Sequence, residues 1–305
     1  MLFFVLRRIL ISICVCLCVL LISFSLTRMS GDVATTIAGP EATQADIEQV
    51  RRAYGLDRPL AVQLADWAGH AVRGDFGQSF YFRKDVSSLI VERMPTTFRL
   101  GVFGMLVGLA LALPLGILAA LYEGRFLDRA IQLLISANQA VPSFWLALML
   151  IIVFGVHLGW LPTTGADSWR HFIMPTLVLG LSVLPALARL ARSGMIKALA
   201  SDYVRTARAK GLSSFSIIVK HALRNAAIPI VAIAAVQFGN ALGGSVVIES
   251  VFALHGVGHL AWESIIKSDV AVIQATVLMF SIIYVVITFI SDVMNAMLDP
   301  RIRLS

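Results

Sequence analysis

The chain has 305 residues, of which 58% are apolar and only 14% are charged, and its mean hydropathy is +0.84. About a quarter of the residues of a soluble domain are charged, so this composition excludes an ordinary soluble protein and indicates an integral membrane protein. The net charge of +7 fits the excess of Lys and Arg that membrane proteins carry on the cytoplasmic side, and we expect no nucleic-acid partner.

Six stretches are long and apolar enough to cross a bilayer, whose hydrocarbon core of about 30 Å needs about 20 helical residues. They cover residues 9–28, 100–122, 130–157, 172–195, 226–249 and 270–297. Prolines are expected to kink or interrupt the spans that contain them, at Pro114, Pro142, Pro175 and Pro185. The predicted fold class is therefore an all-α integral membrane protein with six transmembrane helices.

The chain divides into three parts: the N-terminal cytoplasmic end and first span at 1–29, an extracytoplasmic region at 30–98, and a five-span core at 99–305. Two cations before the first span mimic a secretory signal peptide, but the apolar run is too long and lacks a cleavage pattern, which indicates an uncleaved anchor. In the outer region, Asp46–Tyr54 and Leu60–Trp67 have helical apolar spacing and predict a small amphipathic cap.

Positively charged residues set the expected orientation, because Lys and Arg are enriched in short cytoplasmic loops. An inside N-terminus places most loop cations in the cytoplasm: Arg7, Arg8, Arg125, Arg129, Lys197, Arg205, Arg208, Lys210, Lys220, Arg224, Arg301 and Arg303. Only Arg170 and Lys267 then lie in short outer loops. We expect a multi-pass chain in the cell (inner) membrane with both termini in the cytoplasm.

The long inner loop, at about 196–226, is predicted to form two helices. Ser201 is a suitable N-cap for the first helix, and Gly211 is suited to end it in a left-handed conformation. A second helix is expected to start near Ser214, with one apolar stripe. Its members are Phe215, Ile218, Val219, Ala222 and Leu223. Such a loop either meets a partner protein or lies on anionic lipid.

Polar residues within the spans are mostly neutral, and four of them are candidates to line a translocation path. These are Gln139, Ser143, Gln237 and Asn240. The last two share one helix face, beside Gly239, Gly243 and Gly244, which are expected to allow close helix approach. Interhelical hydrogen bonding is the alternative role of these polar residues.

Two acids, Glu249 and Asp292, lie near span ends, where water or headgroups would reach them. A charged residue in the middle of a span would indicate a proton relay. Because these two lie near span ends, we interpret them as boundary or packing-network residues rather than proton carriers.

No catalytic, cofactor or metal site is predicted. The sequence has no Gly-Lys pair for a phosphate-binding loop and no Gly-x-Ser-x-Gly or His-Glu-x-x-His motif, so it is not expected to be an enzyme and ATP must bind to another subunit. His255 and His259 have the spacing of two metal ligands on a helix, but Gly256 and Gly258 argue against a helix there. The cysteines of the first span are interpreted as packing residues.

The inner loop resembles the coupling loop of permease subunits in binding-protein-dependent, ATP-driven importers. That family's pattern begins Glu-Ala-Ala and reaches Gly six residues after its first position, and here Arg205-Thr-Ala207 and Gly211 occupy these places. Arg in place of Glu is typical of the peptide and nickel permease family. Further matching segments are Gly55–Leu60, Gly74–Ser79, Arg93–Thr97, Gly159–Pro162 and Leu298–Arg303. Ile37–Ala42 and Gly159–Trp169 are similar to the glutathione-importing branch.

The resemblance implies a type I ABC importer permease fold and the import of small peptides, glutathione among them, by alternating access. A nickel permease of the same family and an ion-coupled carrier or channel are the alternatives. The implied partners are a second homologous permease subunit, two ATP-binding subunits and an extracytoplasmic solute-binding protein, besides membrane lipid. The residues implied to couple the chain to the ATPases are Arg205, Thr206, Ala207, Gly211, His221 and Leu223.

Overall fold

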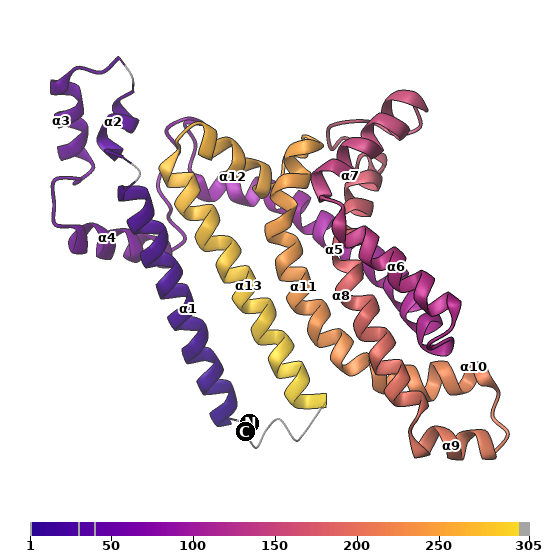
Figure 1. Cartoon of the computed structure of the whole chain (residues 1–305). Coiled ribbons are helices and arrows are strands. Elements are labelled where there is room, and N and C mark those ends of the chain that lie inside the picture. Colours follow the sequence, from indigo (N-terminus) through magenta and orange to yellow (C-terminus); the bar gives the residue numbers. More distant parts are fainter. Residues whose placement is uncertain (1, 30, 40, 299–305) are drawn as a thin grey trace.

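The computed structural model describes residues 2–29, 31–39 and 41–298, and their regular structure is helical apart from an isolated bridge between Gln78 and Asp85 (Figure 1). This confirms the predicted all-α fold class. The helices in chain order are α1 (Leu2–Met29), α2 (Val33–Ala38), α3 (Gln44–Ala53), α4 (Leu60–Val72), α5 (Val86–Leu121), α6 (Phe126–Ala140), α7 (Ser143–Leu150), η1 (Ile151–His157), η2 (Trp169–Phe172), α8 (Ile173–Leu199), α9 (Asp202–Ala209), α10 (Ser214–Ser216), η3 (Ile217–Ala222), α11 (Leu223–Val251), α12 (Val257–Ile266) and α13 (Val270–Leu298). The tail from residue 299, with Arg301 and Arg303, lies outside the described residues.

Five helices in the described part of the chain are long and apolar enough to span a bilayer. They are α1, α5, α8, α11 and α13, and the apolar stretches within them begin and end close to the predicted spans, with one exception. The span predicted from residue 100 belongs to a helix that already starts at Val86, so the predicted boundary of the outer region at residue 98 falls inside α5. Val86, Leu89 and Ile90 are buried against α12 and α13, and this packing explains the longer helix.

The third predicted span is broken into two helices. α6 ends at Ala140, α7 starts at Ser143, and the two axes bend by 94° at the break. Pro142 takes the N-cap position of α7, where its missing amide hydrogen costs no helical hydrogen bond. The interruption expected at Pro142 is therefore confirmed. Pro114 and Pro185 lie inside α5 and α8, which continue through them.

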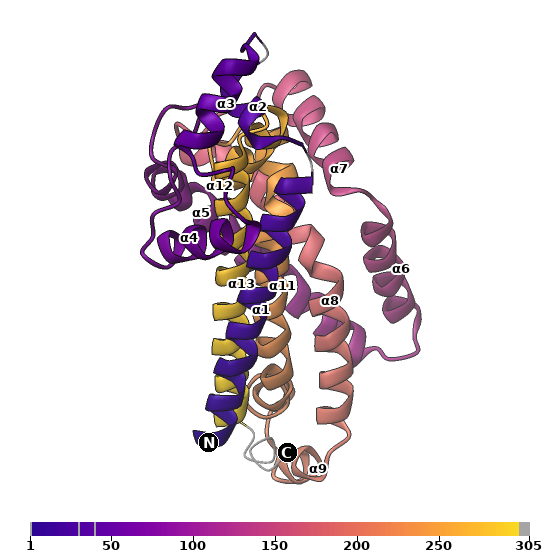
Figure 2. The ribbon, with the colours of Figure 1, turned by 90° about the vertical axis from the view of Figure 1, so that its left-hand side faces the viewer.

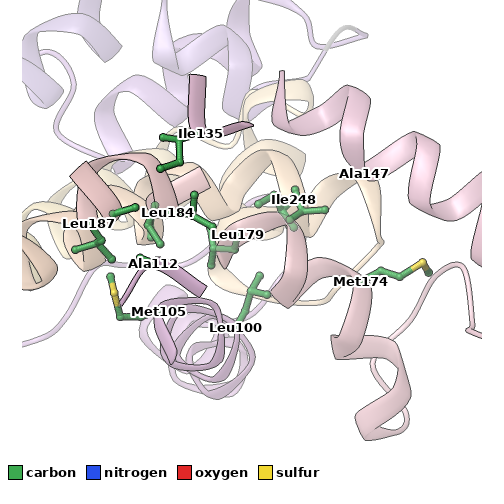
Figure 3. Close-up of a cluster of buried hydrophobic side chains, with 14 of the residues drawn as sticks. Leu100, Met105, Ala112, Ile135, Ala147, Met174, Leu179, Leu184, Leu187 and Ile248 are labelled. Carbon is green, nitrogen blue, oxygen red and sulfur yellow. The ribbon is translucent and has the colours of Figure 1, made fainter. Parts of the chain in front are cut away.

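The core lies between α5 and α8, which pack along most of their lengths (Figure 3). Leu100 and Met105 of α5 pack with Leu179, Leu184 and Leu187 of α8 in one buried cluster. Glycines permit this close approach. A Cβ placed on Gly116 would lie 2.7 Å from the carbonyl oxygen of Ala188, and one on Gly180 would lie 3.0 Å from that of Gly104.

Gly116→Ala is expected to destabilise the chain by about 1–3 kcal/mol, because the new methyl group meets backbone and helix α8 must move away. Gly244→Ala is the matched control, since its Cβ would lie in open space on an exposed face of α11. The thermal unfolding midpoint of the detergent-purified chain should fall for Gly116→Ala and not for Gly244→Ala. Equal midpoints for the two variants would contradict the tight α5–α8 contact.

The two ends of the bundle differ in structure. Figure 1 and Figure 2 both show α9 at the end of the bundle where α1 begins and α13 ends. At the opposite end, α12 lies across α11 and α13, and α2 and α3 stand beside the end of α1. Both helices predicted in the outer region are present, as α3 and α4. Thr43 and Asp46 form a reciprocal capping box at the start of α3.

Candidate functional site

The inner loop adopts the predicted helix, turn and helix. α9 starts after Ser201, which takes the predicted N-cap position, although its hydroxyl bonds to the carbonyl oxygen of Ala198 rather than capping α9. Gly211 has a φ of 76°, which confirms the left-handed turn. The next helix starts at Ser214, where the hydroxyl of Ser213 accepts a hydrogen bond from the backbone N–H of Ser216 at 3.3 Å. From Ile217 the helix continues as the π-helical segment η3 and then runs directly into α11.

The loop has a small apolar core of its own. Val204 and Ala207 of α9 pack against Ile217, and all three are at least 95% buried. Three members of the predicted stripe, Ile218, Ala222 and Leu223, pack in one cluster against α8. Phe215 and Val219 are 76% and 41% exposed, and the buried Ile217 was not predicted, so the stripe is only partly buried. The π-helical turn causes this difference, because one more residue per turn shifts the register that a 3.6-residue period predicts.

The loop is joined rigidly to the membrane helices. Ala222 and Ala226 pack with Met195 and Ala198 of α8 in a second buried cluster, and Leu223 is half-buried against it. Because this contact is closely packed, we expect α9 and α10 to move together with the adjoining ends of α8 and α11.

The predicted coupling residues take different positions on this loop. Arg205 and Thr206 are exposed, and His221 and Leu223 are half-buried near the start of α11. Ala207 is 5% exposed and belongs to the loop's own core, so the contact face that we expected it to offer is turned inward. The loop surface carries four exposed cations, Arg205, Arg208, Lys210 and Lys220, beside the exposed Phe215. Tyr203, Leu212 and Val219 are also exposed, each at 41%.

The four predicted path residues form two pairs. Gln139 and Ser143 lie on either side of the break between α6 and α7, with Gln139 exposed and Ser143 half-buried. On α11, the exposed Asn240 donates its amide to the Oε1 atom of Gln237 at 3.2 Å, which confirms that these two share a face. Among the residues that the structure describes, no hydrogen bond joins one pair to the other.

The glycines beside Asn240 differ in their surroundings. A Cβ on Gly239 would lie 2.9 Å from the Cε2 atom of Tyr284, so this glycine does allow α13 to approach closely. Gly243 and Gly244 are exposed and a Cβ on either would lie in open space, so the expected close approach at these two is wrong within this chain. The surface around Asn240 is thus open.

A buried polar network at the C-terminal end of α11 was only partly predicted. Glu249 is completely buried, so the expectation that water or headgroups reach it is wrong, but its place in a packing network is confirmed. Its carboxylate accepts hydrogen bonds from the hydroxyl of Thr97 at 2.8 Å, the hydroxyl of Ser245 at 3.0 Å and the backbone N–H of His259 at 2.9 Å. The hydroxyl of Thr97 in turn accepts from the backbone N–H of Val257 at 2.8 Å.

This network caps the N-terminus of α12 and fixes it to α5 and α11. Gly258 lies within the first turn of α12, so the expectation that this glycine and Gly256 exclude a helix here is wrong. Both glycines are needed for space: a Cβ on Gly256 would lie 2.6 Å from the Cδ atom of Glu249, and one on Gly258 would lie 2.7 Å from the Cα atom of Val246.

An ion pair that the sequence did not predict joins α6 to α8. Arg192 of α8 binds Asp128 of α6 in a bidentate pair, with Nε to Oδ1 at 2.8 Å and the second nitrogen to Oδ2 at 2.7 Å. Asp128 is 4% exposed and also accepts the backbone N–H of Gly124 at 2.9 Å. Asp292, the other acid near a span end, pairs with Arg8 at 2.9 Å and joins α13 to α1.

His255 and His259 lie beside each other, with ring centroids 5.6 Å apart. Burial lowers the pKa of His259, and the nearby His255 and Arg93 lower it further against the opposing effect of Glu263. The imidazole is therefore neutral at neutral pH. Within the described part of the chain, no group of three or more His, Cys, Asp or Glu residues has the geometry to hold a metal ion.

Comparisons with known proteins agree on one family. Residues 112–304 match the family model described as binding-protein-dependent transport system inner membrane component, and residues 1–101 match the N-terminal model of the same kind of membrane component. The chain is 43% identical to the glutathione transport system permease protein GsiC of Salmonella choleraesuis and 42% identical to that of Escherichia coli K12. Each alignment spans 304 residues and 99% of both chains.

Solved structures show the same fold at low sequence identity. The MetNI methionine ABC transporter in an inward-facing conformation superposes with a TM-score of 0.60 at 19% identity, covering 69% of this chain and 96% of that one. An amino acid ABC transporter with histidines gives a TM-score of 0.51 at 16% identity, over 70% of this chain and 94% of that one. These matches establish a shared permease fold.

Proposed function

This chain belongs to the family of binding-protein-dependent transport system inner membrane components, and we propose that it is the permease subunit of an ATP-driven importer of glutathione or closely related small peptides. The observation that carries this proposal is the identity of 42–43% with glutathione transport permeases over 99% of both chains. The chain itself holds no phosphate-binding Gly-Lys motif, which fits energy supplied by separate ATPase subunits.

Uptake into proteoliposomes tests this function. The chain is reconstituted with its partner permease, the ATP-binding subunits and the solute-binding protein, and the entry of radiolabelled glutathione, a neutral dipeptide and Ni²⁺ is compared. We expect glutathione uptake that requires ATP and the binding protein. Uptake of Ni²⁺ in preference to peptides would favour the nickel permease alternative, and uptake without the ATPases would favour a carrier or channel.

The proposed assembly contains a second, homologous permease subunit beside this one. Support comes from the open surface of α11 around Asn240, Gly243 and Gly244, which is apolar apart from its amides and is not covered within this chain. Support for the ATPase contact comes from the inner loop, which combines exposed cations with the exposed Phe215 on a rigid helix pair.

Alternating access follows from this geometry as the proposed mechanism. Closure of the ATPases moves the inner loop, and the buried joint at Ala222 and Met195 transmits the movement to α8 and α11. The bidentate pair between Arg192 and Asp128 carries the same movement to α6, next to the break at Pro142. The helices that border the candidate path residues are thus linked to the loop by rigid contacts.

Reporter fusions test the proposed orientation, with both termini in the cytoplasm. A reporter that is active only outside the cytoplasm should be inactive when fused after Gly124 or Gly211, and active when fused after Arg58, Gly165 or Glu263. The reason is the Lys and Arg excess in the loops at the α9 end of the bundle. Activity after Gly211 combined with inactivity after Arg58 would reverse the orientation.

Asn240→Leu tests the proposed translocation path. If the amides of Gln237 and Asn240 line the path, the variant should slow uptake of every accepted peptide by a similar factor, while assembly and cargo binding by the receptor stay intact. Asn138→Leu is the control for a packing role, because Asn138 donates to the carbonyl oxygen of Leu181 at 2.7 Å and its loss should lower stability instead. Loss of assembly in Asn240→Leu, with normal uptake by the complexes that do form, would assign Asn240 to packing.

A further inference from the structure

The membrane-spanning part of α8 carries two arginines that differ in their surroundings. The guanidinium of Arg192 is neutralised by the carboxylate of Asp128. Arg189 is exposed, and its guanidinium forms no ion pair or hydrogen bond with the residues that the structure describes. Because a charged side chain is costly among lipid tails, an arginine within a span almost always faces a water-filled cavity or a binding partner. Arg189 is therefore a candidate functional residue.

Arg189 lies on the side of α8 that faces away from α5. Ala191 marks the side toward α5, because a Cβ on Gly116 of α5 would lie 2.6 Å from the Cβ atom of Ala191. Two residues along an α-helix correspond to a rotation of about 200°, which places Arg189 on the opposite side. Ser182 and Ser193, seven residues before and four residues after Arg189, share its face and are also exposed. Exposed polar residues thus follow one another along this face of α8.

The amide pair of α11 lies on the same side of the bundle. A Cβ on Gly101 of α5 would lie 2.8 Å from the Cδ2 atom of Leu242, so Leu242 marks the side of α11 toward α5. Asn240 is two residues away and exposed, and it therefore faces away from α5. Its amide donates to Gln237 at 3.2 Å. Because α8 and α11 pack side by side and both pack against α5 (Figure 1, Figure 2), their polar faces point to the same side.

The spacing of these groups along the bundle matches a short peptide. α8 and α11 run in opposite directions, and a Cβ on Gly194 of α8 would lie 3.2 Å from the Cβ atom of Ala226 of α11, which gives a common level for the two helices. At a rise of 1.5 Å per residue, Arg189 is about 8 Å from this level and Gln237 is about 17 Å from it in the same direction. The two residues are thus about 9 Å apart along the bundle, and an extended tripeptide is about 10 Å long.

We propose that Arg189 binds the C-terminal carboxylate of the translocated peptide while the amides of Gln237 and Asn240 bind its peptide groups. The inference rests on the proposed function, the import of glutathione or closely related small peptides. At neutral pH glutathione carries two carboxylates and one ammonium group, so its net charge is negative. The carboxylate at its glycine end has no ammonium group beside it, and a guanidinium offers such a carboxylate two parallel N–H donors.

A series of charges at this one position tests the inference. The complete transporter is reconstituted in proteoliposomes, and the initial ATP-driven uptake of radiolabelled glutathione is measured below saturation. We expect Arg189→Lys to stay within about threefold of the unaltered complex and Arg189→Gln to be about tenfold slower, because it loses a charge-assisted hydrogen bond. Arg189→Glu should be slower again by at least about tenfold, because it repels the carboxylate. ATP hydrolysis stimulated by the binding protein should be retained in all three variants, since Arg189 is exposed.

Arg99 provides the matched control. It is an exposed cation of α5 directly before the predicted span at 100–122, and Arg99→Gln and Arg99→Glu should both leave uptake within about twofold. Equal uptake by Arg189→Gln and Arg189→Glu would show that charge at this position does not act on the cargo. Loss of the other subunits from Arg189→Gln on purification would assign Arg189 to a contact between subunits. Either result overturns the inference but not the proposed function, which fails only if the unaltered complex imports no glutathione or related peptide.

Discussion

Phe215→Glu is expected to abolish ATP-driven uptake while the chain remains inserted in the membrane. Phe215 is 76% exposed on the inner loop and is the most exposed large apolar side chain of its helix, where Ile217 is buried and Val219 is 41% exposed. An exposed aromatic side chain on a rigid, cation-rich element is the kind of residue that fills a pocket of a partner, and truncating such an anchor commonly costs about 2–4 kcal/mol of binding. That loss is a factor of about 30 to 800 in affinity, enough to separate the subunits at cellular concentrations.

Phe126→Glu is the matched control for this prediction. Phe126 is 86% exposed at the start of α6, at the same end of the bundle, but it lies outside the inner loop. Co-purification of the ATP-binding subunits and ATP-dependent uptake should both be lost in Phe215→Glu and kept in Phe126→Glu. If the loop instead lay on anionic lipid, Phe215→Glu would retain the ATPases, and that result would remove the loop from the coupling mechanism.

The structure also changes which loop substitutions are informative. Ala207→Glu would place a charge in the contact between Val204 and Ile217 and unfold the loop, so it does not report on a partner surface. Gly211→Val meets no neighbouring atom, and its cost is the left-handed backbone alone, about 1 kcal/mol or more. The exposed Phe215 therefore gives a sharper test than either residue that the sequence pattern favours.

Features that depend on local sequence could be predicted well. Apolar stretches identify α8, α11 and α13 because a bilayer imposes one length on any helix that crosses it. The N-cap position of Ser201 and the left-handed turn at Gly211 were predictable because capping involves only the residues next to a helix end.

Features that depend on non-local contacts or on unusual helical geometry could not be predicted. A proline indicates that a helix breaks but does not give the angle of the break. The 94° angle between α6 and α7 depends on how both helices pack against α8. Arg192 and Asp128 are 64 residues apart, and Thr97 and Glu249 are 152 apart, so no spacing rule connects them. The π-helical turn at Ile217 changes which residues of the second loop helix are buried. A prediction from a 3.6-residue period cannot include this change, because it treats the whole segment as a regular α-helix.

Glu249→Leu is expected to lower the stability of the chain by about 2–6 kcal/mol, at about 1–3 kcal/mol for each of two buried donors left without an acceptor. Without the carboxylate, the hydroxyl of Thr97 and the backbone N–H of His259 lose their acceptor in a place that water does not reach. The hydroxyl of Ser245 can still donate to the carbonyl oxygen of Leu242 at 2.8 Å. The N-terminus of α12 then has only the Thr97 hydroxyl as a cap. The thermal unfolding midpoint in detergent should fall sharply.

Substitutions at Thr97 test whether loss of stability comes from the hydrogen-bond network itself or from any change of packing at this end of α11. Thr97→Ser keeps the hydroxyl that donates to Glu249 and accepts from Val257, and it should leave the midpoint nearly unchanged. Thr97→Val removes both hydrogen bonds and should destabilise by about 1–3 kcal/mol. Because both residues cap the same helix end, Glu249→Leu combined with Thr97→Val should cost less than the two single variants together. Full additivity would show that Thr97 and Glu249 act independently, and an unchanged midpoint in Glu249→Leu would contradict the buried network itself.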